Sequence, residues 1–322
     1  MRILVTGSNG WIGQRVCKYL LAVGVEVLGG DVQQSMSAEL NGKGVVGYFP
    51  LDIRKPVVNL DCEVNAVIHC AGYAHRPDEP PEEQMMFYTV NRDGTRNVLA
   101  WCEREGIERF LYVSSIAFYD WGTVSTASVT EDHPVALPTH YAKSKYEGEQ
   151  LVSSSSLDWR IVRLATVFGE GDRANFSRMA KAMKKHLFPV PGKGSARKSV
   201  IPVQLAAELI ADFTLMDNPP HYLINLGLPK APNLREIADA YNDVCGLPEC
   251  PTIPMPLAKG LGVCGDVAAK MLGKFPFTTD TLGKLTTSTE VSVERMQACF
   301  PDKEFGSFEE YLSECQDWYR SI

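Results

Sequence analysis

A glycine-rich turn directly after the first apolar segment constrains the fold of this chain more than any other feature. Residues 2–6, RILVT, are a run typical of a buried strand, and residues 11–22 have the apolar spacing of a helix. Such a junction lets backbone amides approach a pyrophosphate, whose charge the helix N-terminus stabilises. We therefore predict a dinucleotide site here, against the alternative of a merely tight turn. Its residues are Gly7, Asn9, Gly10, Trp11, Ile12 and Gly13.

An aspartate at the end of the second predicted strand indicates which dinucleotide is bound. The segment VEVLGGD ends at Asp31, close to the distance expected for an acid that hydrogen-bonds the adenine ribose hydroxyls. A carboxylate there repels a 2′-phosphate, and no arginine follows at once, so NAD is favoured over NADP. A turn aspartate at a strand end is the alternative.

Two further strand ends are expected to line the same site. Asp52 and Ile53 follow the third strand and are expected at the adenine edge. His69 ends the fourth strand and is interpreted as a packed, hydrogen-bonded histidine rather than as an acid or base. Small residues suited to a strand that passes a dinucleotide follow it: Cys70, Ala71 and Gly72.

Strands and helices alternate along the first half of the chain. Strands are predicted at residues 2–6, 25–28, 45–49, 64–70, 109–114 and 159–165, and helices at 11–22, 84–105 and 141–152. Several strands are apolar on both faces, which is typical of a parallel sheet covered by helices on both sides. We therefore predict a doubly wound α/β fold of the Rossmann type.

The pattern changes beyond residue 169. Helices are predicted at 176–185, 204–216, 234–245, 257–272 and 308–320, with a strand at 222–226. The prediction is an NAD-binding domain at 1–168 and a smaller α/β substrate lobe at 169–322. Because no flexible linker divides the two parts, we expect them to be interleaved, with later segments completing the sheet.

Composition argues against several classes of function. The 322 residues contain 32 Lys and Arg against 39 Asp and Glu, so a net charge of −7 makes general nucleic-acid binding unexpected. No apolar run reaches the length of a membrane span and no signal-peptide pattern is present, so no membrane partner is expected. The nine scattered cysteines suit a reducing, cytoplasmic compartment, and their spacing predicts no metal site.

Tyr141 and Lys145 pose the main question about chemistry. They stand in YAKSK, one helical turn apart on the same face of a predicted helix. Taken alone, this spacing is better explained as the solvated side of an ordinary amphipathic helix.

The order of the motifs along the chain decides between these interpretations. They run through TGSNGWIG at 6–13, Asp31, LDI at 51–53, HCAG at 69–72, VNRDGTRNVL at 90–99, YVSSIAFY at 112–119, YAKSK at 141–145 and RLATVFGEG at 163–171. In this order they resemble the extended short-chain dehydrogenase/reductase family, especially its nucleotide-sugar epimerase and dehydratase branch. The resemblance covers nearly the whole chain.

The resemblance implies catalytic roles for four residues. Ser115, Tyr141 and Lys145 match the family's catalytic triad, with Asn91 in support. A tyrosine titrates near pH 10, and a neighbouring ammonium together with a cationic nicotinamide ring would lower its pKa towards the range of a useful base. Lys145 would also hold the nicotinamide ribose, and Ser115 would orient the substrate oxygen. Ser114 is the alternative serine.

The same resemblance implies that the C-terminal lobe binds a nucleotide-sugar substrate. Asn175 in RANF and Arg197 in GKGSARKSV match residues that contact the diphosphate, and Ser115 and Tyr141 would contact the sugar. A solvated basic loop is the alternative for Arg197. The sequence departs from the UDP-galactose 4-epimerases at Thr166, where those enzymes usually have asparagine. Residues 284–297 also contain no clear counterpart of a later clamping arginine.

The implied activity is that of an NAD-dependent nucleotide-sugar 4-epimerase, which takes hydride from sugar C4 and returns it to the opposite face. The alternatives are a nucleotide-linked 4-ketosugar reductase or dehydrogenase, and a non-catalytic family member that senses NAD(H). Dehydration is disfavoured, because SSIAF stands where sugar 4,6-dehydratases carry an Asp-Glu pair. The family also implies a homodimer formed through the helices at 84–105 and 141–152.

Overall fold

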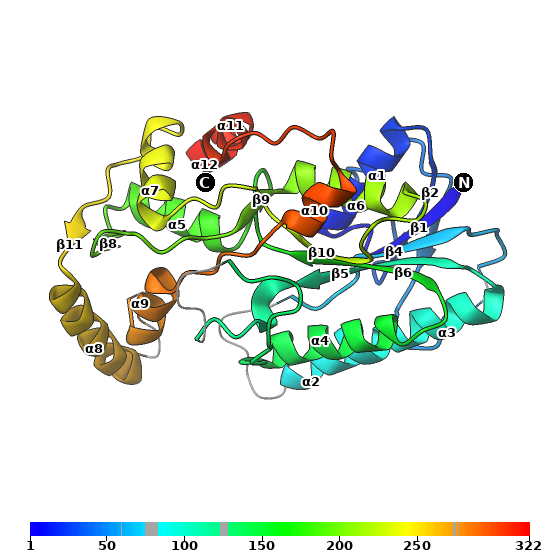
Figure 1. Cartoon of the computed structure of the whole chain (residues 1–322), viewed down its shortest axis with the longest axis horizontal. Coiled ribbons are helices and arrows are strands. Elements are labelled where there is room, and N and C mark those ends of the chain that lie inside the picture. Colours follow the sequence, from blue (N-terminus) through cyan, green and yellow to red (C-terminus); the bar gives the residue numbers. More distant parts are fainter. Residues whose placement is uncertain (59, 75–82, 123–127, 273–274, 276) are drawn as a thin grey trace.

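Seven parallel strands form the central sheet of the computed structural model, which describes residues 1–322 except 59, 75–82, 123–127, 273–274 and 276 (Figure 1). In sheet order they are β10 (Leu223–Leu226), β6 (Asp158–Leu164), β5 (Arg109–Ser115), β4 (Ala66–His69), β1 (Arg2–Thr6), β2 (Glu26–Asp31) and β3 (Gly47–Pro50). The predicted doubly wound α/β fold of the Rossmann type is confirmed.

Helices cover both faces of this sheet, as Figure 1 shows. On one face α1 (Trp11–Ala22) packs against α6 (Val203–Leu215), and on the other α3 (Thr95–Glu105) lies beside α4 (His140–Ser153). Each face has its own cluster of buried apolar side chains. Since β10 and α6 come from the second half of the chain, that half completes the sheet and also covers it.

The other elements of the second half form a smaller lobe at the end of the sheet away from the N-terminus (Figure 1). Two short parallel pairs join β7 (Thr166–Phe168) to β9 (Val200–Pro202) and β8 (Val190–Pro191) to β11 (Thr252–Ile253). The lobe's helices are α5 (Asn175–Lys184), α7 (Leu234–Asp243), α8 (Met255–Leu272), α9 (Thr279–Thr286), α11 (Phe308–Glu314) and α12 (Gln316–Ser321), while α10 (Glu294–Cys299) contacts β10. No helix in the described part of the chain is both long and apolar enough to cross a membrane.

Two helices predicted as continuous are divided. The helix predicted at 308–320 ends at Glu314, since Cys315 adopts φ −122° and ψ 16°, and α12 follows. The helix predicted at 84–105 begins as α2 (Gln84–Phe87), widens into a π-helical segment, η2 (Tyr88–Gly94), and continues as α3.

The widened turn coincides with a close approach of α4. A Cβ on Gly148 of α4 would lie 2.6 Å from the carbonyl oxygen of Asn91 in η2 and 2.4 Å from the hydroxyl of Tyr112 in β5. Glycine is required where backbone and neighbouring side chains come this close. Short π-helical turns within α-helices frequently mark functional sites.

A buried ion pair ties α4 to the sheet. The Glu149 carboxylate on α4 accepts from the Arg163 guanidinium on β6, and the two side chains are 1% and 6% exposed. Ser114 donates to the same carboxylate at 2.8 Å, and Arg163 also donates to the Tyr119 hydroxyl at 2.7 Å and the Glu131 carbonyl at 2.6 Å. Burial lowers the pKa of Arg163, but the hydrogen bonds and charge of Glu149 more than offset this and raise it.

Arg163→Met removes the guanidinium and leaves the Glu149 carboxylate buried. We expect the free energy of unfolding to fall by about 3–5 kcal/mol, because a buried charge without its partner is strongly destabilising. Lys284→Met is the matched control, since its pair with Asp280 is exposed and such pairs contribute about 0–1 kcal/mol. Chemical unfolding followed by circular dichroism measures both variants. Equal losses would contradict a structural role for the buried pair.

Candidate functional site

The glycine-rich turn connects β1 to the start of α1. Gly7 has φ +68°, in the left-handed region that favours glycine, and a Cβ there would lie 2.7 Å from the backbone nitrogen of Ala71. A Cβ on Gly13 would lie 2.1 Å from the Gly7 carbonyl oxygen. Gly10 stands at the N-cap of α1, and no side chain caps the helix there. The close backbone approach and the uncapped helix start fit the pyrophosphate of a dinucleotide.

Asp31 and Asn9 form the side of the turn that faces β2. The Asp31 carboxylate accepts from the backbone amides of Asn9 at 3.1 Å and Gln33 at 3.2 Å. Its oxygens retain lone pairs for ribose hydroxyls. The Asn9 side chain is engaged within the protein, because its amide donates to the Tyr48 hydroxyl and its oxygen accepts from the Ser37 amide. Asn9 therefore joins the loop after β2 to the turn.

Trp11, expected in the site as part of the turn, also joins α1 to the second half of the chain. Its indole N–H donates to the Glu170 carbonyl at 2.7 Å, and Arg15 donates to the same oxygen at 2.6 Å. The Arg15 guanidinium lies 5.8 Å from the Trp11 ring centroid. Sequence reasoning missed Arg15 and Glu170, because only the tertiary fold brings residues so far apart in the chain together.

The two residues expected at the adenine edge both have partners in the protein. Arg54 binds the two carboxylate oxygens of Asp52 at 2.8 Å, and it lowers the pKa of that carboxyl. The Ile53 side chain packs against Gly94. A Cβ on Gly94 would lie 2.7 Å from Cδ1 of Ile53. The Ile53 carbonyl accepts from Asn97 of α3. Contacts of these residues with adenine remain a prediction.

Tyr141 and Ser115 meet where β5 ends and α4 begins. Ser115 is the last residue of β5, Tyr141 lies in the first turn of α4, and their side chains are hydrogen-bonded. The alternative serine, Ser114, is buried and donates to Glu149 instead. The structure thus brings Ser115, and not Ser114, to the Tyr141 hydroxyl.

Lys145 lies one turn further along α4 and is 6% exposed. Its Nζ donates to the Val113 carbonyl at 2.6 Å and stands 4.1 Å from the centroid of the Tyr112 ring. Burial lowers the pKa of Lys145 to about 7, and Cys70 and Glu149 only partly oppose this. The lysine is therefore only partly charged near neutral pH.

The protein by itself raises the pKa of Tyr141, and the lowering expected from Lys145 together with a cationic nicotinamide ring stays a prediction. Burial causes the rise, and the hydrogen bond with Ser115 opposes it. Lys145 contributes little because its charge is reduced and its ammonium is directed to the Val113 carbonyl. A cationic nicotinamide ring beside Tyr141 is therefore the group expected to favour its phenolate.

Asn91 fixes the loop that follows β4. Its side-chain oxygen accepts from the Tyr73 amide at 2.7 Å, and its amide donates to the Tyr73 carbonyl at 3.1 Å and to the Ser144 hydroxyl of α4 at 3.0 Å. A Cβ on Gly72 would lie 3.3 Å from Asn91 Oδ1 and 3.9 Å from Lys145 Nζ. Asn91 thus stands close to the lysine and connects three parts of the candidate site.

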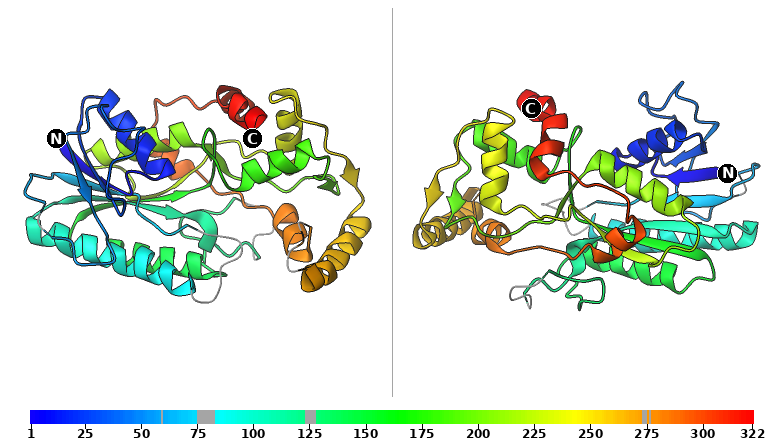
Figure 2. Two further views of the ribbon diagram at one scale, coloured as in Figure 1. Left: turned by 180° about the vertical axis from the view of Figure 1, so that it is seen from behind. Right: turned by 45° about the horizontal axis from the view of Figure 1, so that its top comes forward.

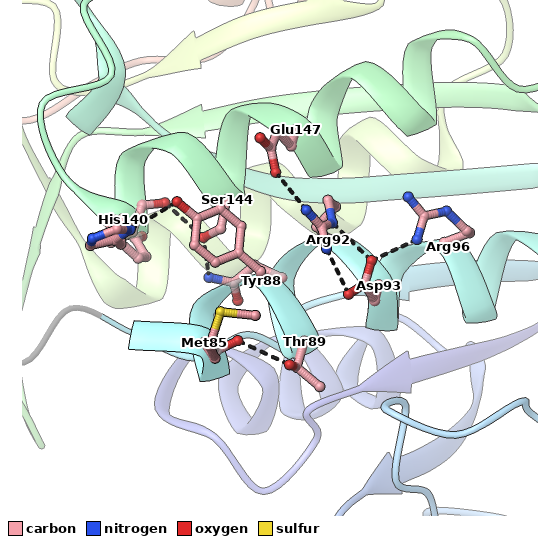
Figure 3. Close-up of polar contacts among 11 residues, drawn as sticks. Met85, Tyr88, Thr89, Arg92, Asp93, Arg96, His140, Ser144 and Glu147 are labelled. Atoms are coloured by element: carbon pink, nitrogen blue, oxygen red, sulfur yellow. Dashed lines mark hydrogen bonds and ion pairs between the residues drawn. The ribbon is translucent and has the colours of Figure 1, made fainter. Parts of the chain in front are cut away.

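Further polar contacts join η2 to α4, as Figure 3 shows. The Tyr88 hydroxyl lies 2.8 Å from His140 Nδ1, and Arg92 donates to Glu147 at 3.4 Å. Arg92 also forms an ion pair with Asp93 beside it. These contacts hold the π-helical segment against the helix that carries Tyr141 and Lys145.

A buried chain of hydrogen bonds connects the dinucleotide turn to η2. His69 Nδ1 lies 2.7 Å from Thr6 Oγ1, and His69 Nε2 lies 3.1 Å from Thr95 Oγ1. Thr95 donates its only hydroxyl proton to the Asn91 carbonyl, so it must accept from Nε2–H. Nδ1 is then the acceptor for Thr6, which itself accepts from the Ala71 amide. The donors therefore fix the tautomer of His69, which confirms its interpretation as a packed, hydrogen-bonded residue.

The predicted substrate residues lie in separate parts of the second half. Thr166 is in β7 and Asn175 is the exposed first residue of α5. Arg197 donates to the Ala231 carbonyl at 2.7 Å and lies 3.8 Å from the Glu290 carboxylate. Among the described residues, no hydrogen bond or ion pair joins these three side chains to one another. Their roles remain predictions.

The segment 284–297, which the sequence left without a clamping arginine, does contain Arg295. Its guanidinium lies 3.5 Å from the Glu131 carboxylate and also pairs with Asp132. Arg295 is therefore engaged by acidic residues. Within the described ranges, no group of three His, Cys, Asp or Glu side chains could hold a metal ion.

Comparison with known proteins identifies the family. The model of the NAD dependent epimerase/dehydratase family matches residues 3–224, which is more than half of the chain. The chain belongs to this family. It is therefore an NAD-dependent enzyme, as the sequence predicted, and the glycine turn and Asp31 fit that cofactor.

Two curated relatives in the family span most of this chain. One is a UDP-glucose 4-epimerase from Vibrio cholerae, 28% identical over 308 residues that make up 90% of this chain and 87% of the relative. The other is N-acetyl-alpha-D-glucosaminyl-diphospho-ditrans,octacis-undecaprenol 4-epimerase from Escherichia coli O157:H7, 27% identical over 288 residues that make up 84% and 81%.

A solved structure shares the fold over nearly the whole chain. The UDP-glucose 4-epimerase of Thermus thermophilus, determined as a complex with NAD, matches with a TM-score of 0.73 and covers 99% of each chain. Its sequence is 23% identical to this one.

Gly13→Ala tests the close packing of the dinucleotide turn. The added Cβ meets the Gly7 carbonyl, so we expect the free energy of unfolding to fall by about 1–3 kcal/mol and NAD affinity to fall at least about tenfold. Gly283→Ala is the control, because nothing lies within 4 Å of its added Cβ and alanine favours a helix by about 0.5–1 kcal/mol. Thermal unfolding and titration calorimetry measure the two effects. Unchanged NAD affinity in Gly13→Ala would count against the turn as the pyrophosphate site.

His69→Phe tests the buried hydrogen-bond chain. It removes the two ring nitrogens that bond to the Thr6 and Thr95 hydroxyls, so we expect the free energy of unfolding to fall by about 2–3 kcal/mol at pH 7.5. We expect no comparable loss for His140→Gln at an exposed histidine. Burial, and then Lys145, lower the pKa of His69 to about 3, whereas the ring in the unfolded chain takes up a proton below about pH 6.5.

The stability deficit of His69→Phe is also expected to depend on pH. Because the unfolded chain binds the extra proton, wild-type stability falls as the pH drops from 6.5 towards 3, by about 1.4 kcal/mol per pH unit from this group. His69→Phe lacks this dependence, so its stability deficit should shrink by roughly 2 kcal/mol between pH 7.5 and pH 5. Urea unfolding at both pH values measures it, and a constant deficit would refute the neutral buried ring.

Proposed function

We propose that this protein is an NAD-dependent nucleotide-sugar 4-epimerase. The observation that carries the proposal is the meeting of Ser115 and Tyr141 at the end of β5, with Lys145 one turn away. Family membership and two curated relatives named as 4-epimerases support the reaction class. When bound, NAD supplies the hydride acceptor and donor of the reaction.

The residues of the site divide the proton chemistry between them. Tyr141, as phenolate, takes the proton of the sugar C4 hydroxyl as that carbon is oxidised, and returns it when the carbon is reduced from the opposite face. Ser115, hydrogen-bonded to Tyr141, orients the same oxygen. Lys145 would hold the nicotinamide ribose, since its ammonium has donors beyond the one given to the Val113 carbonyl, and Asn91 keeps the loop at Gly72 and Tyr73 in place.

A second candidate substrate is a sugar carried on a polyprenyl diphosphate. Arg197 and Arg295 already have protein partners, and because both carriers present a diphosphate, these two arginines do not select between them. One of the two curated relatives is named for such a lipid-linked sugar. This candidate keeps the same chemistry at C4 and changes only the carrier.

We also propose a homodimer formed by α2–α3 and α4. Met85 on α2 is 63% exposed, so an apolar side chain on α2 is available for such a contact. Light scattering on the purified protein gives the mass that tests this.

Tyr141→Phe removes the proposed base and keeps the ring. We expect the turnover number to fall by about 10²–10⁴-fold while NAD stays bound, since proton transfer by a positioned side chain contributes about that factor. Tyr146→Phe, one residue after Lys145, is the matched control and should keep near-wild-type turnover. The assay follows interconversion of C4 epimers in a panel of UDP-, GDP- and dTDP-hexoses, N-acetylhexosamines and a polyprenyl-diphosphate N-acetylhexosamine.

The assay also separates the alternative activities. Epimer interconversion without added reductant supports the epimerase, and the carrier that reacts selects between the two substrates. Activity that appears only when NADH or NAD⁺ is supplied would replace this proposal with the 4-ketosugar reductase or dehydrogenase. A function that survives Tyr141→Phe intact would indicate a binding protein.

A further inference from the structure

We propose that helix α8 docks on the surface of a phospholipid bilayer through its exposed apolar side. The helix lies at the far end of the substrate lobe from the N-terminal strands, and all three views in Figures 1 and 2 place it at the edge of the molecule. The proposal is independent of which sugar the active site accepts.

Only a narrow stripe of α8 is held by the protein. Ala258 is fully buried, and a Cβ on Gly262 would lie 3.3 Å from the Thr279 backbone nitrogen. A Cβ on Gly265 would lie 1.8 Å from the Phe277 carbonyl oxygen, so α8 packs directly on the chain that leads into α9. The residues on this packed side are small, and the rest of the helix surface faces away from the protein.

The outward side is strongly apolar. Of the fourteen large apolar side chains that are exposed among the described residues, six lie between positions 257 and 275. Their exposed fractions range from 42% for Phe275 to 81% for Met271. The five on α8 are Leu257, Leu261, Val263, Val267 and Met271. At roughly 100° per residue these five span a sector of roughly 160°, with the exposed Cys264 inside it.

The charges on α8 favour a lipid surface. Lys259 and Lys270 lie at one border of the apolar sector, where long lysine side chains can reach phosphate groups while the apolar side enters the bilayer. Asp266 accepts from the Thr279 amide and hydroxyl and is therefore engaged by α9. The helix thus presents positive charge on a chain whose net charge is −7. This local reversal of sign suits anionic headgroups.

A second copy of the chain fits this side less well. Eighteen residues of helix are about 27 Å long and about 10 Å wide, so α8 alone could bury roughly 270 Å² per partner. Stable protein interfaces bury about 800 Å² per partner. Insertion of a convex apolar helix side among lipid headgroups needs no such complementary surface.

Cys264 provides a native probe for the test. On the 322-residue chain with Cys62→Ser, which removes one of the two half-buried thiols, the exposed Cys264 is labelled with an environment-sensitive fluorophore, and mass spectrometry confirms that Cys70 is unlabelled. The protein is mixed with vesicles of phosphatidylethanolamine and phosphatidylglycerol (3:1), or of phosphatidylcholine alone. We expect a blue shift, a gain in intensity and co-flotation with the anionic vesicles, and weaker binding to phosphatidylcholine.

Matched pairs of substitutions locate the surface. Leu261→Glu with Val267→Glu should reduce apparent affinity for the anionic vesicles at least about tenfold. Val23→Glu with Leu187→Glu, which adds the same charge at exposed apolar residues elsewhere, should leave it within about twofold. Melting temperatures and epimer interconversion on soluble substrates should stay unchanged in both pairs, which separates this proposal from the catalytic one.

Three outcomes would overturn the proposal. The first is an absence of flotation of the wild-type protein. The second is an equal loss of binding in the two pairs of variants. The third is self-association, measured by light scattering, that disappears in Leu261→Glu with Val267→Glu while no vesicles bind. That last result would assign this side of α8 to a second copy of the chain.

Discussion

The buried pair of Glu149 and Arg163 is the interaction on which the arrangement of the site depends. An ion pair removed from water is tolerated only when its hydrogen-bonding capacity is used. Here Ser114 donates a hydrogen bond to the carboxylate, and the guanidinium donates to the Tyr119 hydroxyl and the Glu131 carbonyl. The pair therefore fixes α4, and with it Tyr141 and Lys145, at a defined position against β5 and β6.

The same network reaches the second half of the chain. The Tyr119 hydroxyl donates to the Asn225 side chain of β10, and the Asn225 backbone amide donates to the Glu131 carboxylate. Arg295 of α10 then pairs with Glu131. One continuous set of polar contacts thus connects α4 to the edge strand β10, which the later sequence supplies. This explains how the sheet and the smaller lobe can share residues without a linker between them.

In the candidate site the protein favours neutral side chains, and a positive charge would come from the cofactor. Burial favours the neutral forms of both Tyr141 and Lys145, because the site is closed on one side by Tyr112, Val113 and Phe87. The hydrogen-bond chain through His69 adds no charge, since its ring is neutral. A site of this kind carries little charge of its own, and it favours the tyrosinate when a cation is bound beside it.

The sequence allowed most of the fold to be predicted, because its signals are local. Runs such as RILVT, the alternation of strands with helices, and the glycine turn before α1 all gave elements within a few residues of those observed. The short pairs β7–β9 and β8–β11 were missed, since strands of two or three residues carry no periodicity. The π-helical turn was missed for another reason. It coincides with the packing of Gly148 against Asn91, and the two lie 57 positions apart.

The sequence by itself determined the Rossmann-type fold, the NAD preference and the candidates for the triad, since each rests on residues close together in the chain or on their order. Only the tertiary structure decided between Ser114 and Ser115, paired Asp52 with Arg54, and directed Lys145 to the Val113 carbonyl. It also left the apolar side of α8 outward. The physical reason is the same in each case. Burial, pKa and hydrogen-bond partners depend on which distant segments exclude water from a side chain, and no local pattern records that.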